Sequence, residues 1–233
     1  MLNVLRPFFT RLLTPVSQWL ARTPVTPNMV TVVGTLGVSG GALALFPTGH
    51  LLAGVIVCTV FVFADMLDGT LARIKGSSGA WGAFLDSTLD RIADAAVFAG
   101  LAAYFVTGGD SRLMAGVATY CLVTGSLVSY AKARAQGLGV SCDVGIAERT
   151  ERLLIALVAA GLAGLGVPYV LPAGLWVLAG LTTITLGQRV WAVRQGTAAS
   201  AAETTAGAPA RDDGADRAGQ GTGPGGSAGQ AKG

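Results

Sequence analysis

The stretch DMLDGTLARIKGSSGAWGAFLDSTLDRIADA, residues 65–95, places five aspartates in a chain that is otherwise mostly apolar. Of the 233 residues, 52% are hydrophobic and 12% are charged, which is far more apolar than an average soluble domain. We therefore expect most of the chain to lie in lipid, and we expect the charge in this stretch to serve a function.

Apolar runs within and around the stretch are long enough to be membrane helices. A helix needs about 18 to 25 weakly charged residues to cross the hydrocarbon layer. Six such runs are present: Met29–Phe46, Leu51–Ile74, Gly82–Phe105, Leu113–Ala133, Leu153–Val170 and Ala173–Val193. The sequence thus predicts an all-α membrane protein with six transmembrane helices in one domain, residues 29–195.

The two ends of the chain differ from this domain. Residues 1–28 contain no acidic residue, and their large apolar side chains recur at roughly helical spacing. This pattern predicts a juxtamembrane amphipathic helix at the inner membrane surface. In residues 196–233 Ala, Gly, Thr and Ser predominate, so there is little to bury and we expect a disordered cytoplasmic tail.

Lysine and arginine indicate the orientation, because they stay on the cytoplasmic side of a membrane. With the N-terminus inside, 14 of the 16 fall in inner segments, Arg91 lies within the third run, and only Arg112 falls in an outer loop. We expect a multi-pass protein of the cell (plasma) membrane, with both termini and the charged stretch cytoplasmic. Membrane topology and attraction to anionic lipids explain the excess of basic over acidic residues, so no nucleic-acid partner is expected.

The aspartates of the stretch fall on matched helical faces. Asp65 and Asp68 are three residues apart near the end of the second run, and Asp86, Asp90 and Asp94 recur every four residues in the third. Residues at these spacings share a face, and the short GSSGAW loop returns the chain at the same depth. The two acidic faces are therefore expected to meet at the cytoplasmic edge.

Carboxylates brought together in this way would repel one another unless cations neutralise them. Oxygen ligands favour Mg²⁺ or Mn²⁺, while the lone histidine and the absence of a CxxC spacing argue against zinc. Four carboxylates match two divalent ions, an arrangement that binds a pyrophosphate and stabilises its displacement. The alternative is that these aspartates are solvated helix ends paired with nearby basic residues.

Eight positions of the stretch fit, without a gap, the signature of the CDP-alcohol phosphotransferase family: Asp65, Asp68, Gly69, Ala72, Arg73, Gly82, Asp86 and Asp90. The chain therefore resembles a family of six-helix membrane bundles, usually homodimeric. Its members transfer a phosphatidyl or similar group from a CDP-linked lipid to an alcohol and release CMP. The resemblance implies that the four aspartates of the signature bind two Mg²⁺ ions, or Mn²⁺ in their place, and that Asp90 is also the general base for the acceptor hydroxyl.

The same resemblance implies a set of contacts to CDP-diacylglycerol: Asn28, Thr31, Asp65, Asp68, Gly69, Arg73, Ser78 and Gly79. On physical grounds, the small Gly69 permits close approach of a ligand and Arg73 is a bidentate phosphate partner. The segment around Asn28 also fits a plain capped helix start. At Gly79 relatives often carry a hydroxyl residue, so this chain departs from the family there.

The motifs SYAKARA (residues 129–135), GIAERTER (145–152) and DRIADA (90–95) resemble the actinobacterial phosphatidylinositol phosphate synthase branch of the family. This implies 1D-myo-inositol 3-phosphate as the acceptor and phosphatidylinositol phosphate as the product. The inositol phosphate would be held by four residues: Ser129, Lys132, Arg152 and Arg189. The excess of positive charge on inner segments, which topology alone requires, is the competing explanation for these cations.

Other functions stay open on the sequence. A phosphatidylglycerophosphate synthase would use the same chemistry with glycerol 3-phosphate, which also carries a phosphate. A divalent-cation transporter also uses carboxylates inside a helical bundle, although here the acidic residues cluster at one end. A scaffold without catalysis would have no need of a complete signature.

Overall fold

Six long helices make up most of the part of the chain that the structure describes. The computed structural model describes residues 15–76 and 79–206, with the backbone alone described for 65–66 and 199–206. The long helices are α2 (Pro27–Leu45), α3 (Leu51–Lys75), α4 (Ala80–Thr107), α5 (Arg112–Gly137), α6 (Arg149–Gly164) and α7 (Val170–Ala206). Residues 15–21 are also helical, and the described ranges contain no strand, so the all-α prediction is confirmed.

Four of the described helices are long and apolar enough to cross a membrane: α2, α3, α5 and residues 170–198 of α7. In α4 the apolar pattern is interrupted by Asp86, Asp90, Arg91 and Asp94. With 16 residues, α6 is about 24 Å long, less than the roughly 30 Å of a hydrocarbon core. The helices are those of a membrane protein, and the crossing of the membrane by α4 and α6 stays a prediction.

The predicted boundaries of α6 and of the tail differ most from the structure. The sequence predicts a helix over Leu153–Val170, whereas α6 starts four residues earlier and ends at Gly164. The chain turns there because Gly166 adopts a φ of 91° and Pro168 follows it. At the other boundary, α7 continues to Ala206, so the first residues of the predicted tail are helical. Residues 1–14 of the predicted amphipathic helix and 207–233 of the tail lie outside the described residues.

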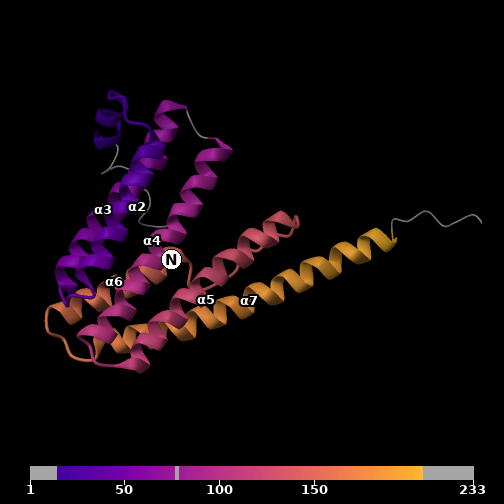
Figure 1. Ribbon diagram of the computed structural model, residues 1–233. Coiled ribbons are helices and arrows are strands. Elements are labelled where there is room, and N and C mark those ends of the chain that lie inside the picture. Colours follow the sequence, from indigo (N-terminus) through magenta and orange to yellow (C-terminus); the bar gives the residue numbers. More distant parts are fainter. Residues whose placement is uncertain (1–14, 77–78, 207–233) are drawn as a thin grey trace, which may run out of the picture. The chain divides into compact units, whose positions relative to one another are not determined.

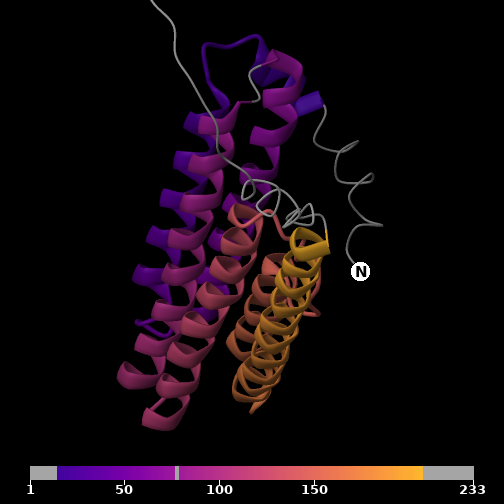
Figure 2. The same cartoon turned by 90° about the vertical axis from the view of Figure 1, so that its right-hand side faces the viewer.

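Small and polar residues set the contacts between helices. α2 packs against both α3 and α4, α4 against α5, and α6 against α3, while α5 and α7 lie side by side in both views (Figures 1 and 2). Gly100 lets α4 approach α2, since a Cβ there would lie 2.6 Å from the carbonyl oxygen of Ala42. The hydroxyl of Tyr120 on α5 lies 2.7 Å from that of Thr183 on α7.

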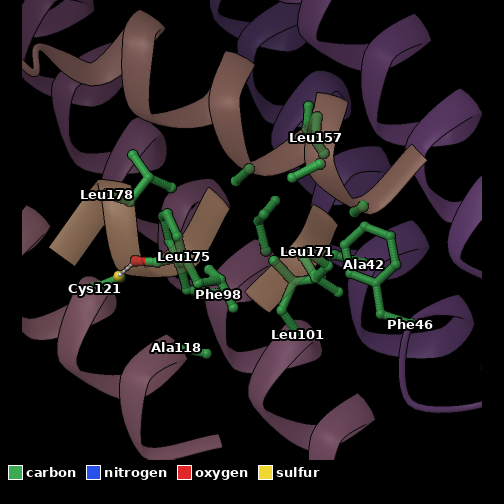
Figure 3. Packing of buried hydrophobic residues seen from close by; sticks show 14 of the residues in the cluster. Ala42, Phe46, Phe98, Leu101, Ala118, Cys121, Leu157, Leu171, Leu175 and Leu178 are labelled. Atoms are coloured by element: carbon green, nitrogen blue, oxygen red, sulfur yellow. Dashed lines mark hydrogen bonds between the residues drawn. The ribbon is translucent and has the colours of Figure 1, made fainter. Parts of the chain in front are cut away.

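The apolar core gathers toward the end of the bundle that holds the α2–α3, α4–α5 and α6–α7 loops. Phe46, Phe98, Leu101 and Leu171, all buried, belong to this cluster (Figure 3). Within it, the thiol of Cys121 donates to the carbonyl oxygen of Leu175 at 3.5 Å and links α5 to α7. Most of the charged residues of the helices, with exceptions such as Arg112, lie toward the opposite end, which carries the α3–α4 and α5–α6 turns.

Candidate active site

Two cavities open at this charged end of the bundle. The first, which we name the signature cavity, has a volume of about 190 Å³ and lies between the start of α2, the end of α3 and the start of α4. It is lined by Pro27, Asn28, Thr31, Asp68, Gly69, Ala72, Gly79, Gly82, Ala83 and Asp86. Most of the family signature therefore surrounds one hollow.

The start of α2 is built to present polar atoms to the signature cavity. The Thr26 side chain caps the helix by accepting a hydrogen bond from the amide of Met29 at 3.3 Å, and Pro27 occupies the first helical position. One turn later, the hydroxyl of Thr31 donates a short hydrogen bond to Oδ2 of Asp68 on α3. This bond holds the carboxylate of Asp68 at the cavity wall.

Two glycines give the signature cavity its space. A Cβ on Gly69 would meet nothing within 4 Å, so the surface of α3 is open there to a ligand. A Cβ on Gly82 would lie 3.5 Å from Oδ1 of Asn28, which shows how near the start of α4 lies to α2. Because neither glycine has a side chain, the backbone itself forms the wall of the signature cavity at both positions.

Lys75, in the last turn of α3, secures the segment that precedes α2. Its ammonium group donates to the carbonyl oxygens of Thr23 at 2.9 Å and Val25 at 2.7 Å. Since this segment leads directly into Pro27 and Asn28, Lys75 ties one wall of the signature cavity to another.

The second cavity, which we name the basic cavity, has a volume of about 580 Å³. It lies on the side of α4 that faces α5, the start of α6 and α7. Its five basic lining residues are Arg91, Lys132, Arg149, Arg152 and Arg189, and the remaining lining residues are Ser87, Thr88, Ser126, Ser129, Tyr130, Ala133, Gln136 and Glu148. Such a concentration of donors suits an anion with several oxygens.

Carboxylates of α4 pair with the arginines of α6. Asp90 Oδ1 lies 2.8 Å from Nη2 of Arg149, and Asp94 Oδ1 accepts from Nε of the same arginine at 3.1 Å. Asp94 Oδ2 accepts from Nη2 of Arg152 at 3.1 Å. Asp94 and Arg152 are only 7% and 2% exposed, so this pairing compensates charges that burial would otherwise make costly.

Backbone oxygens and one exposed carboxylate hold two further cations of the cavity. Arg189, 3% exposed, donates to the carbonyl oxygens of Val144 at 2.9 Å and Val128 at 2.6 Å. Lys132 lies 2.8 Å from Asp143, and this hydrogen bond and positive charge lower the pKa of the Asp143 carboxyl. Both cations are therefore positioned before any ligand binds.

Most of the residues singled out in the sequence line one of the two cavities. Asn28, Thr31, Asp68, Gly69 and Gly79 line the signature cavity together with Asp86. The four residues expected to hold inositol phosphate all line the basic cavity: Ser129, Lys132, Arg152 and Arg189.

Of the three remaining CDP-diacylglycerol contacts that the resemblance implies, one is described and lines neither cavity. This residue is Arg73, which lies in the last turns of α3 and is exposed. Ser78 is outside the described residues, and the side chain of Asp65 is not described.

The three signature aspartates whose side chains are described do not all line one cavity, and Asp90 lines neither. Asp68 and Asp86 line the signature cavity, whereas Asp90 is paired with Arg149. Among the described side chains, which do not include that of Asp65, no group of three or more His, Cys, Asp or Glu lies close enough to hold a metal ion. The donors present are carboxylate oxygens, and these fit a hard divalent cation.

Two basic residues that line the basic cavity were not among the residues expected to hold inositol phosphate. Arg91 donates to the Ser129 hydroxyl, and Arg149 bridges Asp90 and Asp94. The spacing of Arg149 three residues before Arg152 is the sequence signal that points to it, since residues three apart share a helix face. For Arg91, its place beside Asp90 is the corresponding signal.

Comparisons with known proteins show which family the chain is similar to. The chain matches the CDP-alcohol phosphatidyltransferase family over residues 24–185. It is 48% identical to the phosphatidylinositol phosphate synthase of Streptomyces avermitilis, over 86% of this chain and 85% of that protein.

Solved structures of the Mycobacterium tuberculosis phosphatidylinositol phosphate synthase are similar as well, at 43% identity. The one with CDP-DAG bound aligns with a TM-score of 0.76 over 78% of this chain and 94% of that one. The one in complex with manganese and citrate aligns with a TM-score of 0.75 over 78% and 88%. The chain therefore belongs to the CDP-alcohol phosphatidyltransferase family.

Proposed function

We propose that the protein is a phosphatidylinositol phosphate synthase: it transfers the phosphatidyl group of CDP-diacylglycerol to 1D-myo-inositol 3-phosphate and releases CMP. The basic cavity carries this proposal. It lies on α4 next to the signature cavity, and it collects every residue that the resemblance assigns to inositol phosphate. The names of the relatives at 42–48% identity agree with it.

The signature cavity would hold the CDP portion of the donor. Asn28, Thr31 and Gly69 offer polar atoms and open backbone there. Asp65, Asp68, Asp86 and Asp90 would hold the divalent cations, two ions of Mg²⁺ or Mn²⁺. Bound cations neutralise the pyrophosphate and make CMP a better leaving group. A relative solved with manganese supports a divalent cation.

Asp90 is the proposed general base. On α4, Asp86 lines the signature cavity, while Ser87 and Arg91 line the basic cavity, and Asp90 lies one turn after Asp86. A hydroxyl of the inositol gives its proton to Asp90, and its oxygen attacks the lipid-bearing phosphorus. The bond from this phosphorus to the CMP oxygen breaks at the same time, so CMP leaves as phosphatidylinositol phosphate forms.

The acceptor's phosphate would bind the basic cavity. Arg152, Arg189 and Lys132 supply charge and directed N–H donors, and Ser129 supplies a hydroxyl. Arg152 and Arg189 are already held by carboxylate and carbonyl partners, so little side-chain entropy is lost when the phosphate binds.

We propose that the chain crosses the cell membrane six times, with α4 and α6 among the spans, and that two chains form a homodimer. The N-terminal segment would form a helix at the membrane interface. Both cavities would face the cytoplasm, where CDP-diacylglycerol and inositol phosphate can meet. The distribution of Lys and Arg supports this orientation.

The choice of acceptor tests the proposed function. Purified protein is incubated with labelled CDP-diacylglycerol and either inositol phosphate or glycerol 3-phosphate. We expect labelled lipid product and CMP with inositol phosphate alone. Product with glycerol 3-phosphate alone would assign the protein to phosphatidylglycerophosphate synthesis, and metal flux without any CMP would favour the transporter.

Metal binding should be visible without any substrate. Saturating Mn²⁺ at about 100 times its Kd should stabilise the protein by about 2.7 kcal/mol, which raises Tm by roughly 5 to 10 °C for a domain of this size. The Asp86→Asn variant should lose most of this shift, because it removes one of the proposed ligands. An equal shift in the two proteins would contradict the metal assignment.

Replacing Lys75 should weaken donor binding in particular. The Lys75→Met variant loses both hydrogen bonds to the segment before α2, so we expect KM for CDP-diacylglycerol to rise by about 3- to 10-fold, with KM for inositol phosphate unchanged. Arg134→Met is the matched control, since Arg134 is exposed and lines neither cavity. An equal rise in both KM values would show that Lys75 has no particular connection to the signature cavity.

A further inference from the structure

We propose that Asp94 is a positioning residue for the acceptor: its carboxylate holds the guanidinium groups of Arg149 and Arg152 in the orientation that binds the acceptor's phosphate. This inference rests on the proposed function. It assigns a role to the one aspartate of residues 65–95 that lies outside the eight signature positions.

Each oxygen of the Asp94 carboxylate serves one arginine. Oδ1 accepts from Nε of Arg149 and Oδ2 from Nη2 of Arg152, both at 3.1 Å. Both arginines line the basic cavity, whereas Asp94 does not. Asp94 therefore acts on a ligand only through these two side chains.

The contacts fix the plane of each guanidinium group, and this plane decides where its N–H groups point. Arg149 is bound at Nε by Asp94 and at Nη2 by Asp90. Arg152 is bound at Nη2 by Asp94, and its Nη1 donates to the carbonyl oxygen of Ala147 at 3.4 Å. Two points of attachment on each group leave little freedom to rotate.

The surroundings of Arg152 are shaped for this orientation. A Cβ on Gly125 of α5 would lie 3.2 Å from Nε of Arg152, which is a tight contact, so the glycine leaves room for the guanidinium. Arg152 and Arg149 are three residues apart at the start of α6 and share a face. One buried carboxylate of α4 can therefore orient both.

A buried ion pair can also serve stability alone, and the two roles predict different kinetics. A purely stabilising Asp94 would, when replaced, lower the amount of folded enzyme and leave both KM values unchanged. A positioning Asp94 would, when replaced, raise KM for the acceptor and leave KM for the donor unchanged.

The first test is Asp94→Asn. The amide keeps the size of the carboxylate and one acceptor oxygen, but its NH₂ group faces the second arginine. We expect KM for inositol phosphate to rise by about 10- to 50-fold, with KM for CDP-diacylglycerol unchanged. Asp110→Asn is the control, because it makes the same change in the exposed α4–α5 loop at the other end of the bundle.

The second variant, Asp94→Glu, keeps the charge and moves the carboxylate by one methylene. If Asp94 only neutralises buried arginines, this variant binds the acceptor like the wild type. If it positions them, the acceptor KM stays raised. Because it retains the charge, Asp94→Glu also provides the test should Asp94→Asn fail to fold.

Binding of inorganic phosphate separates this inference from the proposed function. The affinity is measured on wild type and Asp94→Glu in detergent, without turnover. If the wild type uses only glycerol 3-phosphate, the proposed acceptor is wrong, while weaker phosphate binding by the variant still supports the positioning role. Unchanged phosphate affinity and acceptor KM in folded Asp94→Glu would overturn the inference, whichever acceptor the enzyme uses.

Discussion

Asp90→Asn is expected to lower kcat by about 100- to 10,000-fold, the usual contribution of a general base, while the protein stays folded. An amide cannot take the proton of the attacking hydroxyl, and it is a weaker ligand for a divalent cation. It has nearly the same shape as the carboxylate, so packing around α4 is retained. CMP release by the purified variant is the measurement.

The control for this prediction must show that the loss is chemical. Asp90 is paired with Arg149 at 2.8 Å, so the variant also removes one partly buried ion pair. Circular dichroism and gel filtration of the variant report whether the helices and the particle size are retained. A folded Asp90→Asn protein with more than about a tenth of wild-type kcat would exclude Asp90 as the base.

Arg152→Gln should affect acceptor binding and stability together. Arg152 is 2% exposed and lines the basic cavity. Loss of two charge-assisted hydrogen bonds to a phosphate should lower kcat/KM for inositol phosphate by about 100-fold or more. Because the change also removes one partner of the buried Asp94, we expect a loss of up to about 3 to 5 kcal/mol in the free energy of unfolding.

A double variant separates the two effects of Arg152→Gln. If Asp94 and Arg152 stabilise each other, the double variant with Asp94→Asn and Arg152→Gln should lose less free energy of unfolding than the two single variants lose in sum. Acceptor kcat/KM should stay as low as in Arg152→Gln. Arg134→Gln, at an exposed position outside both cavities, is the matched control. Unaltered acceptor kinetics in Arg152→Gln would remove Arg152 from the phosphate site.

The helices could be predicted from the sequence because each contains an apolar run, although four charged residues interrupt the run of α4 and α6 has only 16 residues. The ends of the helices could not be predicted equally well, since they depend on local conformation. Just after α6, Gly166 adopts a φ of 91° and the chain turns, and the apolar pattern does not mark this turn. The Ala-rich start of the tail continues α7 to Ala206, as the high helix propensity of alanine permits.

The aspartates show where periodicity alone is too coarse. Four residues advance an α-helix by about 400°, so each step from Asp86 to Asp90 to Asp94 turns the side chain about 40° further around the axis. Asp86 thus lines the signature cavity, Asp94 pairs with α6, and Asp90 lies between them. The sequence places all three on one face, whereas the structure spreads them around α4, which contributes lining residues to both cavities.

The residues of the basic cavity could be predicted only in part, and the reason is a different one. Lysines and arginines at the cytoplasmic ends of spans are expected from topology alone, so the sequence does not separate ligands from topogenic charges. The spacing of Arg149 from Arg152 suggests that they share a face, but its pairing with Asp90 and Asp94 could not be predicted, because these aspartates lie more than fifty residues earlier in the chain.

The central claim is that the two cavities form one active site, in which the acceptor attacks the phosphorus directly. The lone histidine, His50, precedes α3 at the opposite end of the bundle, far along that helix from Asp68. The most direct measurement is exchange of labelled CMP into CDP-diacylglycerol by wild-type enzyme without acceptor. The account predicts no exchange until inositol phosphate is added, and rapid exchange in its absence would contradict direct transfer.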